Sequence, residues 1–232
     1  MMKLATLIAT NNRWDLLTGV SLPSVRRQTR RPDWVVIVND GTPFNADQEH
    51  YLCDLFPDVS VIITGNRRTR GAAGAWNTGL QEINRLAPDA YVAILDDDDA
   101  WEPDHLKINA DVAERDAADI VVSGLRLIIN GRNHERPHVG RLSDRTFLIE
   151  NPGWQGSNTF VSLKSLIQVG GFRDGLKSTN DRDLAIRLLR IEGVRVSYTG
   201  LWTSSWHIRT GLDALSSVGS AAKRSGLRWF WQ

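Results

Sequence analysis

Residues 91–99 read YVAILDDDD, a short apolar run that ends in four adjacent carboxylates. The apolar part has the length and composition of a buried β-strand. Four neighbouring negative charges repel one another, so we expect a cation to offset them. A solvated acidic turn is the alternative, with one aspartate capping a helix that begins at Pro103. We favour a divalent metal, because open α/β sheets bind ligands at the carboxyl ends of their strands.

Similar apolar runs alternate with helical segments through the first half of the chain. This alternation predicts βαβ units and a largely parallel sheet. Trp14, Leu17 and Val20 form a helical face before Pro23. The expected strands are residues 4–9, 35–38, 59–63 and 91–95, and two further helices are expected at residues 73–86 and 104–114.

The pattern changes after about residue 120, which predicts a mixed sheet in the second half. Asn130 and Gly131 are a strong signal for a hairpin turn. Residues 137–156 have the composition of a loop. A strand is expected at residues 156–163, and helices at residues 164–169 and 181–191.

The composition narrows the class of protein. With 232 residues and 41% hydrophobic content, the chain suits one large globular domain. A formal net charge of +1 excludes a general nucleic-acid binder. The single cysteine, Cys53, excludes an internal disulfide framework, and we expect it to be a buried small hydrophobe. No apolar segment is long enough for a membrane span or signal sequence, so we expect a cytoplasmic protein.

Polar residues follow all four strands of the first half: 10–13, 39–42, 66–74 and 96–99. Each set alone is typical of a turn, but four on one sheet edge suit a sugar nucleotide. Asp40 would accept a base N–H, and Arg13 with the arginines at 67, 68 and 70 would face phosphate. Glycines 71, 74 and 79 would let backbone approach the nucleotide.

Five segments, taken in order, resemble family-2 glycosyltransferases of the GT-A fold. The resemblance covers roughly residues 3–200, and sequential order makes it more specific than a single motif. Two positions differ from the family pattern, with Asn180 in place of Glu and Trp76 in place of Arg. The segments are LATLIATNNR, QTRRPDWVVIVNDGT, NRRTRGAAGAWNTGL, YVAILDDDDAWEPDHL and VGGFRDGLKSTNDRDLAIRLL.

The resemblance implies an α/β fold with a Rossmann-like, mostly parallel sheet, flanking helices and a smaller mixed half. A single GT-A domain would then span residues 1–232. It would consist of a nucleotide-binding half (1–100), an acceptor-binding half (101–210) and a C-terminal helix or tail (211–232).

The resemblance also assigns roles to individual residues. Asp40 would contact the nucleobase, Asp96 would lie towards the ribose, and Asp98 would be the main protein ligand of Mn²⁺ or Mg²⁺. Asp181 matches the general base of the family, with helix capping as the alternative. His207 is a candidate further metal ligand, against a packing or surface role. The expected nucleotide-sugar site also includes Thr10, Asn12, Arg13, Arg70, Gly71, Asn77 and Asp97.

We therefore expect an inverting, metal-dependent glycosyltransferase that uses a UDP- or dTDP-sugar and an acceptor hydroxyl. The acceptor would be a natural product, a saccharide, a peptide or a lipid-linked molecule. A sugar-phosphate nucleotidyltransferase and a non-catalytic nucleotide-sugar-binding module are the alternatives; the former generally has a glycine-rich loop after the first strand, and TNNRWD has no glycine.

The tail combines basic residues with Trp229, Phe230 and Trp231. This composition suits packing against the fold or in a homodimer contact, which we favour, or peripheral contact with a membrane.

Overall fold

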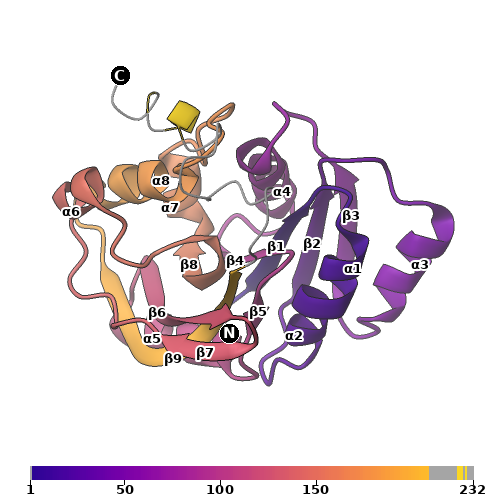
Figure 1. The fold of residues 1–232 in the computed structure, drawn as a ribbon, viewed down its shortest axis with the longest axis horizontal. Coiled ribbons are helices and arrows are strands. Elements are labelled where there is room, and N and C mark those ends of the chain that lie inside the picture. Colours follow the sequence, from indigo (N-terminus) through magenta and orange to yellow (C-terminus); the bar gives the residue numbers. More distant parts are fainter. Residues whose placement is uncertain (1, 209–223, 227, 229–232) are drawn as a thin grey trace.

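The computed structural model describes residues 2–208, 224–226 and 228, and its centre is a mixed sheet (Figure 1). The strand order is β3-β2-β1-β4-β8-β6-β9-β5, and β7 pairs with β6 off this path. The first four strands are parallel, and β8 is antiparallel to both β4 and β6. The strands are β1 (Leu4–Thr10), β2 (Trp34–Asn39), β3 (Ser60–Gly65), β4 (Tyr91–Asp96), β5 (Ala100–Trp101), β6 (Ile120–Ile129), β7 (Arg132–Glu135), β8 (Thr159–Ser162) and β9 (Val196–Ile208).

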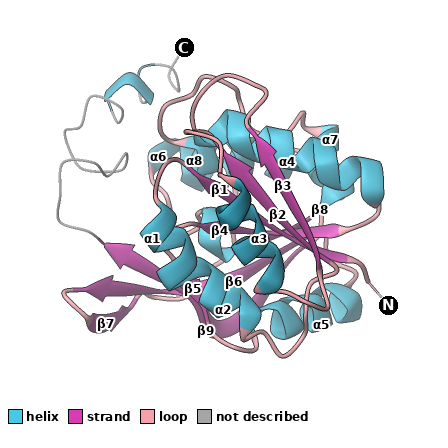
Figure 2. Cartoon of the chain, turned by 90° about the vertical axis from the view of Figure 1, so that its right-hand side faces the viewer, coloured by secondary structure: helices cyan, strands magenta, loops and turns pink. Residues whose placement is uncertain are grey.

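Helices cover both faces of this sheet (Figure 2). Side chains alternate between the faces of a strand, so Leu7 and Ile94 join one apolar cluster while Ile8 and Leu95 join the other. The first cluster includes residues of α4 (Ala72–Leu86), α6 (Asp144–Ile149), α7 (Leu163–Gln168) and α8 (Asn180–Leu189). The second includes residues of the π-helix η1 (Leu17–Ser21), α2 (Leu22–Arg26), α3 (Ala46–Asp54) and α5 (His105–Asp116).

The α/β architecture and the mixed second half are confirmed. The helix expected at residues 73–86 is α4, and Asn130 and Gly131 join β6 to β7 as a hairpin. Gly131 has φ of +75°, a conformation that glycine adopts without strain. In the described part of the chain, no helix is both long and apolar enough to cross a membrane.

Several local expectations need correction. Cys53 is exposed, because Leu52 is the α3 residue that turns into the core and the next side chain points away from it. The segment expected as a loop at residues 137–156 contains α6, whose first turn is capped by the Ser143 hydroxyl. Pro23 does not end the first helical region: α1 (Trp14–Leu16) continues through η1 into α2, where proline is tolerated in the first turn.

The second half of the sheet depends on a late strand that we did not predict. β9 pairs in parallel with β6 and antiparallel with β5, with irregular register next to Gly124. It thereby brings residues 204–207 beside the turn that follows β4. Trp229, Phe230 and Trp231, which carry the packing and membrane interpretations of the tail, lie outside the described residues.

Candidate functional site

The site lies at the carboxyl ends of β1, β2 and β4. In the sheet, Thr10 is level with Asn39 on one side, and Ala9 is level with Asp96 on the other. The residues just after these strands therefore meet at one edge. The strand order, rather than proximity in sequence, brings the polar segment after β1 against the acidic run.

The four aspartates do not share one environment. Asp97 and Asp99 have no exposed surface, whereas Asp96 and Asp98 are partly exposed. The alternation follows from the turn that the run makes, in which the Asp99 N–H donates to the Asp96 carbonyl at 3.1 Å. The cluster therefore separates into an inward pair and an outward pair.

Asp97 is held by the segment after β1. Its carboxylate accepts hydrogen bonds from the Thr10 hydroxyl at 2.7 Å and from Arg13 Nε at 3.0 Å, and it forms a further ion pair with Arg13 Nη2. Burial raises the pKa of Asp97, while the Arg13 charge and these hydrogen bonds oppose the rise. Thr10 and Arg13, both predicted to bind the nucleotide sugar, thus also stabilise the acidic turn.

Asp99 is held from the other side of the site. It accepts a hydrogen bond from the Ser157 hydroxyl at 2.5 Å and one from the His207 backbone N–H at 3.0 Å. Burial raises the pKa of Asp99 to about 7, although both hydrogen bonds oppose the rise. Our sequence analysis gave neither Asp99 nor Ser157 a role, because their contact spans 58 residues.

Asp96 and Asp98 form the outward pair. The Asp98 side chain is 22% exposed and accepts a hydrogen bond from Arg13 Nη1 at 2.9 Å. The Asp96 carboxylate lies beside Gly156, where an added Cβ would stand 3.4 Å from one of its oxygens. Burial raises the pKa of Asp96 well above its usual range, and the charges of Asp99, Asp98, Asp181 and Asp97 raise it further.

This outward pair has the chemistry of a hard-cation site. Carboxylate oxygens are the ligands that Mg²⁺ and Mn²⁺ prefer, and a bound cation would offset the repulsion at Asp96. Among the described residues, no group of three or more His, Cys, Asp or Glu side chains is arranged to hold a metal ion. Mg²⁺ is commonly bound by one or two carboxylates together with substrate phosphates, which fits this pair. A role for His207 as a metal ligand stays a prediction.

Asp181 lies in the first turn of α8, after Thr179 in a left-handed conformation with φ of +66°. Its charge contributes to the raised pKa of Asp96, so the candidate base and the acidic cluster lie close together. The nearby Asp183 is instead buried and pairs with Arg173 at 2.9 Å and Arg187 at 2.5 Å. Asp183 therefore anchors the helix.

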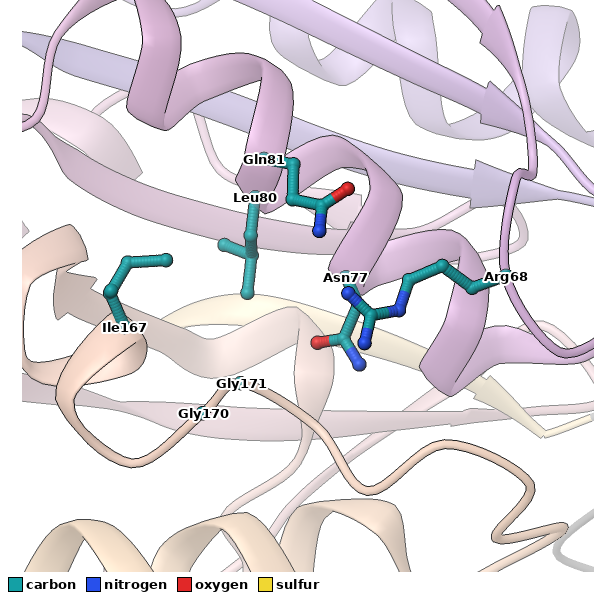
Figure 3. Close-up of a pocket in the computed structure, with 7 residues that line it drawn as sticks. All are labelled: Arg68, Asn77, Leu80, Gln81, Ile167, Gly170 and Gly171. Carbon is teal, nitrogen blue, oxygen red and sulfur yellow. The ribbon is translucent and has the colours of Figure 1, made fainter.

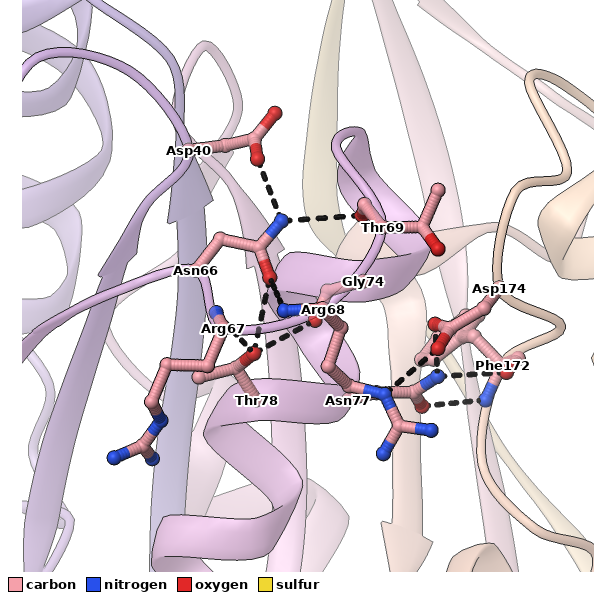
Figure 4. Close-up of polar contacts among 10 residues, drawn as sticks. All are labelled: Asp40, Asn66, Arg67, Arg68, Thr69, Gly74, Asn77, Thr78, Phe172 and Asp174. Atoms are coloured by element: carbon pink, nitrogen blue, oxygen red, sulfur yellow. Dashed lines mark hydrogen bonds and ion pairs between the residues drawn. The ribbon is translucent and has the colours of Figure 1, made fainter.

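Asp40 is fixed at the end of β2 (Figure 4). Its carboxylate accepts hydrogen bonds from Asn66 Nδ2 at 2.6 Å and from the Gly71 N–H at 2.9 Å, and Arg70 donates to its carbonyl at 3.3 Å. Asn66, which has no assigned role in our sequence analysis, also accepts hydrogen bonds from the Arg68 N–H and the Thr78 hydroxyl. It thus orients the predicted nucleobase contact.

Asn12 and Asn77 have structural contacts that the sequence did not reveal. Asn12 accepts a hydrogen bond from the Thr42 N–H at 2.8 Å, which joins the loops after β1 and β2. The Asn77 amide donates to the Phe172 carbonyl at 2.7 Å, and its oxygen accepts the Phe172 N–H at 2.8 Å (Figure 4). The Asn77 carboxamide thus binds the backbone of the segment before Asp181. The neighbouring Trp76 packs against the Phe172 ring.

The remaining arginines after β3 are also paired. Arg68 contacts Asp174 at 2.7 Å, and Arg67 pairs with Glu82. A hollow of about 180 Å³ lies between α4 and the end of α7, and no acidic-cluster residue lines it (Figure 3). Its lining residues are Arg68, Asn77, Leu80, Gln81, Ile167, Gly170 and Gly171.

Comparison with known proteins identifies the family. The model for "Glycosyl transferase family 2" matches residues 6–174, well over half of the chain. The chain belongs to this family. A family relative, the succinoglycan biosynthesis protein ExoW of Rhizobium meliloti, is 35% identical over 107 residues. That alignment covers 46% of this chain and 32% of ExoW, so the chain spans about a third of the length of that relative.

Solved structures confirm the GT-A fold. S. aureus TarS in complex with UDP-GlcNAc matches with a TM-score of 0.68 at 18% identity, over 90% of this chain and 60% of TarS. The mannosyltransferase PcManGT from Pyrobaculum calidifontis, in complex with GDP-Man and Mn²⁺, matches with a TM-score of 0.64 at 19% identity. That match covers 96% of this chain and 59% of PcManGT. At these identities the likeness shows the fold.

Proposed function

We propose that this family-2 chain is an inverting, metal-dependent glycosyltransferase that moves a sugar from a nucleoside-diphosphate sugar to an acceptor hydroxyl. One observation supports the proposal: Asp181 lies near enough to Asp96 for its charge to help raise the pKa of Asp96, as expected if the candidate base and the acidic cluster belong to one site. A transferase needs this arrangement, because the acceptor and the leaving diphosphate must meet at one anomeric carbon.

Donor binding follows from the strand ends. Asp40, whose carboxylate is held by Asn66 and Gly71, would accept an N–H of the base. Asp96 would lie towards the ribose, and Asp98 would hold Mn²⁺ or Mg²⁺. When bound, the cation would offset the negative charge of the diphosphate. TarS binds UDP-GlcNAc and PcManGT binds GDP-Man, so the shared fold alone does not select the base; we favour UDP or dTDP.

The chemical step needs one proton acceptor in the chain. Asp181 would take the proton of the acceptor hydroxyl while its oxygen attacks the anomeric carbon. The new C–O bond forms on one face, and the bond to the diphosphate oxygen breaks on the opposite face with its electron pair leaving on the diphosphate. Because Asp181 lies in the first turn of α8, the helix dipole favours its charged, proton-accepting form.

The two halves of the fold would divide the substrates. We assign donor binding to residues 1–100 and acceptor binding to residues 101–210. The acceptor is proposed only as a hydroxyl compound: a natural product, a saccharide, a peptide or a lipid-linked molecule. Occurrence in the cytoplasm and formation of a homodimer remain proposals from the sequence.

A thermal-shift screen tests this function. UDP-, dTDP- and GDP-sugars are tested with and without Mn²⁺ on the wild type and on Asp98→Ala, with the exposed Asp89→Ala as the matched control. We expect at least one donor to raise the melting temperature in a Mn²⁺-dependent way in the wild type and control, and the Mn²⁺ effect to be lost in Asp98→Ala. The proposal would be contradicted if a donor raised the melting temperature equally with and without Mn²⁺, and equally in the wild type and Asp98→Ala.

An assay of the products separates the alternatives. A glycosyltransferase slowly hydrolyses its donor to the nucleoside diphosphate and the free sugar. A nucleotidyltransferase instead releases pyrophosphate when it is given a nucleoside triphosphate and a sugar phosphate. A binding module yields neither product, despite stabilisation by the donor.

A further inference from the structure

The buried Asp99 has no place in the chemistry above. Its carboxylate has no exposed surface and lies beside three other carboxylates. Burying a charge in such surroundings is unfavourable. Stability alone therefore does not explain a buried carboxylate at this position. The contacts of Asp99 indicate another role.

Asp99 joins three segments that are distant in sequence. Its own N–H closes the turn to the Asp96 carbonyl, one carboxylate oxygen accepts the Ser157 hydroxyl, and the other accepts the His207 N–H. The end of β4, the short 3₁₀-helix η2 (Gly156–Asn158) and the end of β9 are therefore held at one point.

Ser157 extends this connection to the outward pair. Its hydroxyl oxygen accepts the Asp96 N–H at 3.2 Å while donating to Asp99. Its carbonyl accepts hydrogen bonds from Trp101 Nε1 and from the Ser204 hydroxyl, both at 2.7 Å. Gly156, directly before it, lies against the Asp96 carboxylate. Both the backbone and the side chain of Asp96 thus rest on the segment that Asp99 holds.

We propose that Asp99, acting through Ser157, is a positioning residue for the outward pair Asp96 and Asp98, of which Asp98 would hold the cation. It fixes the turn in which Asp97 and Asp99 point inward and Asp96 and Asp98 point outward. This inference rests on the proposed function, because it assigns Asp99 the task of orienting the pair in which Asp98 would hold the cation and Asp96 would lie towards the ribose. Groups that orient metal ligands in this way typically contribute about 10–100-fold to metal affinity.

The test measures the binding of nucleoside diphosphate with and without Mn²⁺ by calorimetry. UDP, dTDP and GDP are titrated into the wild type, Asp99→Asn and the exposed control Asp89→Asn. The asparagine has nearly the same size, but its NH₂ group cannot accept a hydrogen bond, so its single oxygen can accept from Ser157 or from the His207 N–H and not from both. We expect Mn²⁺ to tighten binding in the wild type and the control, and this gain to fall about tenfold in Asp99→Asn. Affinity without Mn²⁺ should stay the same.

Each outcome has a distinct meaning. If Mn²⁺ does not affect any of the three nucleotides in the wild type, the proposed function itself fails. If the wild type responds and Asp99→Asn responds equally, the positioning role is overturned. An equal loss with and without Mn²⁺ also overturns it, since that is the result of general loosening. Should Asp99→Asn fail to fold, Ser157→Ala replaces it, with the same expected loss and the same overturning results.

Discussion

The parallel half of the sheet and its mixed half contribute to the candidate site in different ways. In the parallel half, Thr10 and Asp96 end adjacent strands and Asp40 directly follows β2, so strand pairing brings these residues to one edge of the sheet. In the mixed half, Asp181 follows an irregular segment whose position depends on side-chain hydrogen bonds. Strand order thus brings the proposed donor-binding residues to one sheet edge, while the position of the proposed base, Asp181, depends on specific polar contacts across the molecule.

Those contacts come from both halves. Asn77 of α4 holds the Phe172 backbone, and Arg187 of α8 donates to the Val169 and Gly171 carbonyls at 2.7 and 2.6 Å. The segment that leads to Asp181 is thus held by hydrogen bonds from both α4 and α8. Replacing residues on each side of this connection should separate effects on chemistry from effects on stability.

The largest expected effect is on turnover in Asp181→Asn. Losing the proton acceptor should lower kcat by about 10²–10⁴-fold, while donor binding is retained. Removing its charge also relieves repulsion at Asp96. Steady-state kinetics and donor calorimetry check both expectations.

Asp183→Asn is the matched control on the same helix. It weakens ion pairs between the buried Asp183 carboxylate and the partly exposed Arg173 and Arg187, so it should lower the free energy of unfolding by about 2 kcal/mol while the folded enzyme keeps its turnover. If both variants lose turnover to the same extent, Asp181 is not the base.

A smaller effect is expected for Asn77→Ala, which breaks the connection between the halves. The Phe172 N–H and carbonyl lose a buried partner that is only 3% exposed, so the free energy of unfolding should fall by about 3 kcal/mol. Urea unfolding measures this change. Asn84→Ala, at an exposed position on the same helix, should change it by less than about 0.5 kcal/mol. Equal effects at both positions would mean that the carboxamide contacts contribute nothing.

The smallest effect is a pH dependence within the mixed half. His105 is buried on α5, contacts the Thr203 hydroxyl at 2.8 Å and stacks on Trp101. Burial lowers the pKa of His105 from 6.5 to about 3. The unfolded chain therefore takes up a proton below pH 6.5 while the folded chain does not, so stability falls as the pH drops from 6.5 towards 3.

This histidine should contribute up to about 1.4 kcal/mol per pH unit in that range. Unfolding free energies at pH 7 and pH 5 measure the slope, and His105→Gln provides the comparison because it removes the titrating group. An unchanged slope in the variant would show that other groups cause the pH dependence.

Much of the fold could be predicted because its signals are local. The apolar runs of β1, β2 and β4 and the helical spacing of α4 lie within short windows of sequence, and Asn130–Gly131 marks its own hairpin. β9 could not be predicted from its own sequence. It contains buried, partly buried and exposed residues without regular alternation, and its pairing with β6 and β5 makes it a strand. The expectation that Cys53 is buried was wrong for a related reason. An apolar stretch of sequence does not show which side of the helix faces the core.

The sequence by itself determined the kind of chemistry at the site: carboxylates after a buried strand, arginines near them, and an aspartate at a helix start. Only the tertiary structure decided the burial and the hydrogen-bond partners of each carboxylate. Arg13 and Thr10 turn Asp97 inward, and Ser157 and the His207 backbone do the same for Asp99. The physical reason is that identical neighbouring side chains differ only through their partners, and those partners lie 58 to 108 residues away.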